Sequence, residues 1–120
     1  MKKLNILYLE DNLIFRQHFE YFGRGNHEIE STDDPALALS WIKENDFNFD
    51  LIVTDCNLGR DKMNGLQFAQ KAHKLTAVPI VMVTAGNVRD LDLWETGIVQ
   101  VLTKPIVRRD FDEIIGLVAV

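Results

Sequence analysis

Four short apolar runs, none of them interrupted by a charged residue, constrain the fold of this chain most strongly. They are Leu4–Leu9, Leu51–Thr54, Pro79–Val83 and Ile98–Leu102. A solid apolar run of this length, without alternation between apolar and polar residues, is typical of a parallel strand that is covered on both faces. A fifth and weaker run, His27–Thr32, completes a set of five predicted strands.

The segments between these runs carry the period of amphipathic helices. The apolar residues that recur at this period are Phe15, Phe19 and Phe22, which we expect in the core; Ala38, Trp41 and Ile42; Leu66, Ala69 and Ala72; and Phe111, Ile114, Ile115 and Val118. Asp34 and Pro35 suit the cap and first turn of the second helix. A further helix over 87–96 is weakly marked, because Asp90 and Asp92 are poor helix formers. This alternation predicts an α/β fold: a single doubly wound five-stranded parallel sheet with about five helices.

Length, charge and cysteine content limit which classes of protein this chain can belong to. A chain of 120 residues that is 47% hydrophobic has room for one such sheet, so we expect a single domain over residues 1–120. The 18 acidic residues against 13 basic ones give a formal charge of −5, which would repel nucleic acid. One cysteine, Cys56, excludes an internal disulfide, and no apolar stretch reaches the ~18 residues of a membrane span. We therefore expect a cytoplasmic domain with no direct nucleic-acid binding and no membrane insertion.

Polar residues follow four of the predicted strands. Glu10 and Asp11 follow the first strand, and Asp55 follows the third. Thr84 follows the fourth strand and Lys104 the fifth. Because the carboxyl ends of parallel strands share one edge of a sheet, we expect these five side chains to converge. Neighbouring carboxylates repel one another unless a cation neutralises them, and a hard divalent ion such as Mg²⁺ suits oxygen ligands of this kind.

The same edge is suited to phosphoryl transfer. Mg²⁺ often shares its ligand shell with a phosphate, and Lys104 with the hydroxyl of Thr84 supplies donors for phosphoryl oxygens. Asp55 is the better candidate nucleophile because it stands alone at the end of a central strand. Glu10 and Asp11 are adjacent to each other and are better suited to bind the metal. A carboxylate that attacks phosphorus forms an aspartyl phosphate.

Four motifs, in this order, resemble those of the receiver domains of two-component response regulators, in particular the chemotaxis-regulator-like receivers. They are Leu9-Glu10-Asp11-Asn12, Phe49-Asp50-Leu51-Ile52-Val53-Thr54-Asp55, Val83-Thr84-Ala85 and Leu102-Thr103-Lys104-Pro105. The resemblance spans essentially the whole chain and implies a flavodoxin-like strand order, 2-1-3-4-5. It implies that Asp11 and Asp55 contact Mg²⁺ directly. It also implies that Glu10 contacts the ion mostly through water and Asn57 through its backbone carbonyl, and that the Lys104-Pro105 peptide bond is cis.

The resemblance also implies a function. A histidine kinase or a histidine phosphotransfer protein would donate a phosphoryl group from its phosphohistidine to Asp55. The phosphorylated domain would then bind a downstream protein differently, and the identity of that protein is unknown from the sequence. Such a domain is not an enzyme beyond self-phosphorylation and self-dephosphorylation.

Three departures from the family pattern leave alternatives open. The chain between Thr84 and Gly97 is shorter than in the usual pattern, so the helix there is expected to be short or irregular. Gly59 stands where the family usually has proline, and the inserted residues 60–62 are expected to bulge into water. Val101 stands where many members carry the aromatic ring that reports phosphorylation. The alternative function is a receiver-like module that docks a partner without phosphorylation. A remote alternative is an aspartate-nucleophile phosphatase, which needs an acid where this chain has Asn57.

Overall fold

The computed structural model describes residues 2–44, 47–86 and 92–118. Its centre is a five-stranded parallel sheet in the order β2-β1-β3-β4-β5. The strands are β1 (Asn5–Leu9), β2 (Glu28–Thr32), β3 (Leu51–Asp55), β4 (Ile80–Thr84) and β5 (Ile98–Thr103). The predicted flavodoxin-like order is confirmed, and each of the five predicted runs forms a strand.

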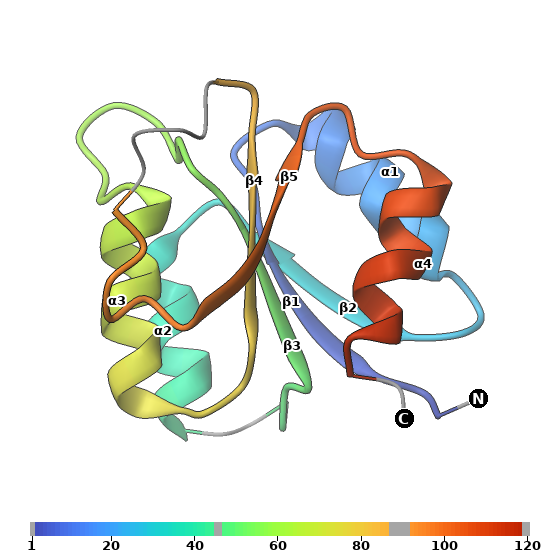
Figure 1. The fold of residues 1–120 in the computed structure, drawn as a ribbon, viewed down its shortest axis with the longest axis horizontal. Coiled ribbons are helices and arrows are strands. Elements are labelled where there is room, and N and C mark those ends of the chain that lie inside the picture. The colour runs from blue at the N-terminus through green and yellow to red at the C-terminus, as the bar shows by residue number, and fades with distance from the viewer. Residues whose placement is uncertain (1, 45–46, 87–91, 119–120) are drawn as a thin grey trace.

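Four helices cover the sheet in the described part of the chain. They are α1 (Leu13–Gly23), α2 (Pro35–Glu44), α3 (Gly65–Leu75) and α4 (Arg108–Gly116). Helices α1 and α4 cover one face of the sheet, and α2 and α3 cover the other (Figure 1). None of the described helices is both long and apolar enough to cross a membrane.

The helix predicted over 87–96 falls partly outside the described residues, which exclude 87–91. The remainder, 92–96, forms turns rather than a helix. The backbone N–H of Thr96 donates to the carbonyl oxygen of Leu93, and the N–H of Trp94 donates to Oδ1 of Asp92. Asp92 therefore holds a turn, in keeping with the preference of aspartate for hydrogen bonds to nearby backbone.

Side chains cap the first turns of three helices. Oδ1 of Asn12 accepts from the two N–H groups at the start of α1, and Oδ1 of Asp34 does the same for α2. Asn64 and Gln67 form a reciprocal capping box at the start of α3. Of the polar residues that the sequence places after strands, Asp55 and Thr84 are the last residues of β3 and β4. The others, Glu10, Asp11 and Lys104, lie in the loops directly after β1 and β5.

Each face of the sheet has its own core, and some of the predicted apolar helix positions are less buried than expected. Of the predicted phenylalanine stripe only Phe19 is fully buried, whereas Phe15 and Phe22 are half-buried. Phe15 lies against the ammonium group of Lys104 instead of deep in the core. On α3, Leu66 is half-buried and Phe68 is fully buried, because the helix turns Phe68 and its next neighbour toward the sheet.

His27, just before β2, is buried and holds the start of β1 in place. Its Nδ1 accepts a hydrogen bond from the backbone N–H of Leu4 at 3.0 Å. Burial lowers the pKa of His27 below its usual value, so the folded protein favours the neutral ring. The unfolded chain, with a histidine pKa of about 6.5, binds this proton more readily. Stability from this group is therefore complete above about pH 6.5 and is lost as the pH falls below that value.

When the pH is lowered from about 7.5 to about 5.5, we expect the urea concentration at the unfolding midpoint to decrease in the unsubstituted protein. The decrease should be smaller in the variant His27→Gln. Glutamine offers an acceptor oxygen to Leu4 and does not titrate. Arg108 and Asp112 of α4 line the same groove as His27 and are present in both proteins, so the comparison removes their contribution. An equal loss of stability in both proteins would assign the acid sensitivity to other groups.

Candidate functional site

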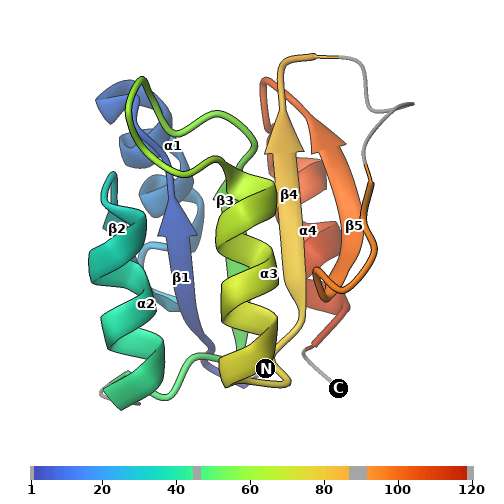
Figure 2. The same cartoon turned by 90° about the vertical axis from the view of Figure 1, so that its left-hand side faces the viewer.

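The carboxyl ends of β1, β3, β4 and β5 lie together at one edge of the sheet, where the arrowheads point in Figure 2. An open cleft lies at this edge. Among the residues that line it are Asp11, Asp55, Asn57, Thr84 and Lys104. The structure thus brings together, around one cleft, side chains that are up to 93 positions apart in the sequence (residue 104 minus residue 11).

Three carboxylates form the acidic part of this site. One oxygen from each of Glu10, Asp11 and Asp55 lies within 4.8 Å of the others. The side chain of Glu10 is fully buried and that of Asp55 is 6% exposed, whereas Asp11 is open to solvent. Carboxylate oxygens at this spacing, with one side toward water, fit a hard cation that keeps part of its hydration shell.

Lys104 bridges two of the carboxylates. Its Nζ lies 2.7 Å from Oε1 of Glu10 and 2.8 Å from Oδ2 of Asp55. The ring of Phe15 lies below the same ammonium group, 4.5 Å from Nζ to the ring centroid. The backbone N–H of Lys104 donates to the carbonyl oxygen of Thr84, which ties the end of β5 to the end of β4. Both the backbone and the ammonium group of Lys104 are therefore fixed by hydrogen bonds.

Burial and charge shift the pKa values of these groups. Burial raises the pKa of Glu10 to about 7; the hydrogen bond from Lys104 opposes this rise, and the proximity of Asp55 adds to it. Burial by itself lowers the pKa of Lys104, but its bonds to Asp55 and Glu10 outweigh that effect and leave the pKa above its usual value. Lys104 is thus a fixed cation, and the cluster gains stability from positive charge.

The remaining predicted residues complete the rim of the cleft. Thr84 is buried, and its Oγ1 accepts a hydrogen bond from the backbone N–H of Gly86 at 3.1 Å. Asn57 is exposed beyond β3, and its backbone N–H points to Oδ1 of Asp55 at 3.4 Å. The peptide bond between Lys104 and Pro105 is cis, as the resemblance implied. Five of the six predicted site residues therefore line the one cleft, and the sixth, Glu10, is buried next to it in contact with Lys104.

The insertion over 60–62 is exposed, as expected, but it is anchored at its end. Nζ of Lys62 donates to the carbonyl oxygen of Asp33 at 3.0 Å and lies 3.7 Å from its Oδ2. This contact joins the loop after β3 to the loop after β2. The bulge is therefore attached to the neighbouring loop beside the acidic residues.

Two residues of the site were not identified from the sequence. Tyr8 was counted only as part of an apolar strand, yet its hydroxyl donates to Oε1 of Glu10 at 3.2 Å. Strand alternation places residues i and i+2 on one face, so the pair was accessible from the sequence. Phe15 was assigned to the core, and nothing in the local sequence indicates its contact with Lys104, which is 89 positions away.

The fold and this cleft define a class of protein: a flavodoxin-like domain with an acidic site and a lysine at the carboxyl edge of its sheet. Within that class, the chain belongs to the family of the response regulator receiver domain, whose model matches residues 6–116. The predicted resemblance is confirmed, and the chain is a signalling domain of the two-component type.

Proteins of known sequence support this assignment. The chain is 30% identical over 112 residues to the protein-glutamate methylesterase/protein-glutamine glutaminase of Escherichia coli strain K12, covering 88% of this chain and 31% of the relative. The same identity and share of this chain are found for the protein of that name from Shigella boydii serotype 4, of which 35% is covered. The chain thus spans about a third of the length of these relatives.

Solved structures show the same fold. The receiver domain of a sensor histidine kinase from Pseudomonas aeruginosa PAO1, with a magnesium ion coordinated in its active site cleft, superposes with a TM-score of 0.82 at 21% identity over 98% of both chains. A CheY-like response regulator receiver domain protein from Methanospirillum hungatei JF-1 gives a TM-score of 0.84 at 23% identity, over 97% of this chain and 93% of that one.

Proposed function

We propose that residues 1–120 act as a single phosphoacceptor receiver domain, in which Asp55 takes a phosphoryl group and thereby changes how the domain binds a partner protein. The observation that carries this proposal is the contact of Lys104 with both Asp55 and Glu10 at the end of the sheet. A lysine held against a nearly buried carboxylate, beside two further acids, provides the charges that phosphoryl transfer requires.

The acidic residues fit Mg²⁺ by number, spacing and chemistry. Asp11 and Asp55 would hold the ion directly, Glu10 through water, and Asn57 through its backbone carbonyl. The ion would supply positive charge against the phosphoryl oxygens. This chain's own cations and donors share that task, because Lys104 and the hydroxyl of Thr84 face the same cleft.

The transfer itself is a displacement at phosphorus. A carboxylate oxygen of Asp55 forms a bond to phosphorus while the phosphorus–nitrogen bond of a phosphohistidine breaks. The imidazole nitrogen keeps the electron pair of that bond and takes a proton from solvent. As phosphoryl oxygens arrive, Lys104 can exchange its contact with Asp55 for one with the new oxygens and remain paired with Glu10.

The donor in this proposal is a histidine kinase or a histidine phosphotransfer protein in the cytoplasm. The domain performs no turnover on a separate substrate. It responds to phosphorylation through a shift between two surface arrangements, and a downstream protein binds one of them better. The alternative, a module that docks its partner without phosphorylation, predicts equal partner affinity with and without a phosphoryl mimic.

Removal of Mg²⁺ is expected to abolish phosphorylation. Without the ion, the negative charges of Asp11 and the incoming phosphate repel each other across the cleft. The domain is incubated with acetyl phosphate in Mg²⁺ and in excess chelator, and incorporation is followed by intact-mass spectrometry. We expect labelling in Mg²⁺ and none in chelator, with recovery when Mg²⁺ is added back.

Equal labelling with and without Mg²⁺ would show that phosphorylation does not need the metal. An absence of labelling under every condition, with no response to a beryllofluoride mimic, would favour the docking module over the phosphoacceptor.

A further inference from the structure

Glu10 is held by three donors, two of them from its neighbours in the sequence and the third from Lys104, directly after β5. The hydroxyl of Tyr8 donates to its Oε1 at 3.2 Å, and Nζ of Lys104 lies 2.7 Å from the same oxygen. The other oxygen, Oε2, accepts the backbone N–H of Asn12 at 3.2 Å. Two donors therefore share Oε1, and only one of them is charged. The hydroxyl of Tyr8 takes one of the two lone pairs of Oε1, beside the contact of Lys104 with the same oxygen.

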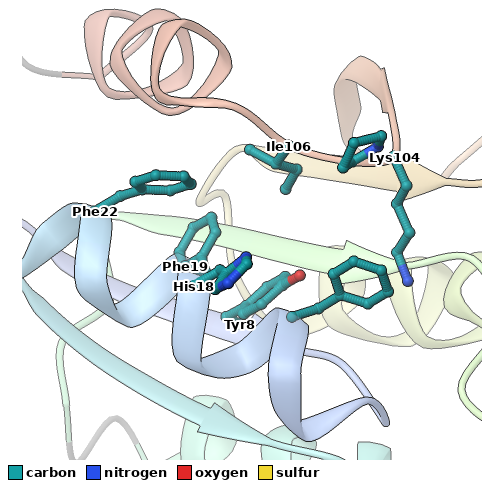
Figure 3. Close-up of a pocket in the computed structure, with 8 residues that line it drawn as sticks. Tyr8, His18, Phe19, Phe22, Lys104 and Ile106 are labelled. Carbon is teal, nitrogen blue, oxygen red and sulfur yellow. The ribbon is translucent and has the colours of Figure 1, made fainter.

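The ring of Tyr8 is fixed by its packing. It is 1% exposed and stacks on Phe19 with ring centroids 4.1 Å apart and planes inclined by 22°. Phe19 in turn packs on Phe111 of α4 in a T-shaped arrangement, with ring centroids 5.2 Å apart. Figure 3 shows Tyr8 and Phe19 on one side of a small apolar cavity, with Ile106 across from them. The aromatic stack therefore points the hydroxyl at Glu10.

We propose that Tyr8 is a positioning residue for the Mg²⁺ and phosphoryl site, acting through Glu10. This inference rests on the proposed function. With the hydroxyl in place, its hydrogen bond orients the Glu10 carboxylate, and Lys104 divides its contacts between Glu10 and Asp55. Without the hydroxyl, Oε1 of Glu10 is left to Lys104 alone, and the ammonium group becomes a stronger competitor of Mg²⁺ for the carboxylates.

The variant Tyr8→Phe tests this directly, because it removes one oxygen and keeps the ring that stacks on Phe19. We expect its dissociation constant for Mg²⁺, from calorimetric or NMR titration, to rise roughly tenfold, as is usual when a group that orients a metal ligand is removed. The matched control is Tyr21→Phe, at the other tyrosine of the chain, whose side chain is exposed on α1. Its dissociation constant should equal that of the unsubstituted protein.

A second measurement separates positioning from general stability. A purely structural role of Tyr8 would lower the melting temperature in chelator and leave Mg²⁺ binding unchanged, and that result would overturn the inference. In the background Glu10→Gln, the further change Tyr8→Phe should alter Mg²⁺ binding less than about twofold, because both changes act on one contact. A full tenfold effect in that background would also overturn it.

The outcomes for this inference and for the proposed function are distinct. If the unsubstituted protein neither binds Mg²⁺ nor accepts a phosphoryl group, the proposed function fails. If the unsubstituted protein binds Mg²⁺ and Tyr8→Phe binds it equally well, only the role of Tyr8 is overturned.

Discussion

The variant Asp55→Asn will incorporate no detectable phosphoryl group from acetyl phosphate in Mg²⁺, under conditions in which the unsubstituted domain is labelled. An amide oxygen is a poor nucleophile and does not form the acyl phosphate, so a loss on the order of 10⁴-fold or more is expected, as for other covalent nucleophiles. The size of the side chain is nearly unchanged. Asn fits the space of Asp55 at the end of the buried strand β3, so the fold should persist.

Intact-mass spectrometry after a fixed incubation checks this result. Asp112→Asn is the matched control, since Asp112 is an exposed aspartate on α4, away from the cleft, and its variant should be labelled normally. Unfolding in urea should show that Asp55→Asn remains folded. Full labelling of Asp55→Asn would place the acceptor at another carboxylate, with Glu10 and Asp11 the nearest.

The acidic edge of the sheet could be predicted because strand periodicity and topology act together. Solid apolar runs occur where both faces of a strand are covered, and parallel strands bring their carboxyl ends to one edge. Once Leu4–Leu9 and Leu51–Thr54 are recognised as such strands, and the strand order implied by the family resemblance makes them neighbours, Glu10 and Asp55 are expected to lie near each other. No knowledge of side-chain packing is needed for that step, and the structure places their oxygens within 4.8 Å.

Features that depend on tertiary packing could not be predicted in the same way. On α3, Leu66 and Phe68 are both apolar, and the helical period alone does not decide which one faces the sheet. The contact between Phe15 and Lys104 depends on how α1 lies against the end of β5. The bond from Lys62 to Asp33 joins two loops whose paths are not encoded by periodicity.

Glycine at position 65 is a requirement of close packing, and Gly65→Ala is expected to destabilise the domain strongly. A Cβ at this position would lie 2.1 Å from the carbonyl oxygen of Asp55 and 3.0 Å from Cα of Cys56. Both are backbone atoms, which cannot rotate out of the way as a side chain can. The N–H of Gly65 donates to the carbonyl oxygen of Cys56 at 2.8 Å, so the start of α3 is held against the end of β3.

The steric conflict would therefore be relieved only if α3 moves away from β3, which breaks that hydrogen bond and displaces Asp55. We expect a loss of about 3 kcal/mol in the free energy of unfolding, from urea titration, and weaker Mg²⁺ binding in the fraction that folds.

Gly116→Ala is the matched control, because a Cβ there meets nothing within 4 Å. It should change stability by less than about 1 kcal/mol, toward greater stability, since alanine loses less chain entropy on folding. Equal effects of the two substitutions would mean that the contact between α3 and β3 yields easily, and Asp55 would then not depend on Gly65 for its position.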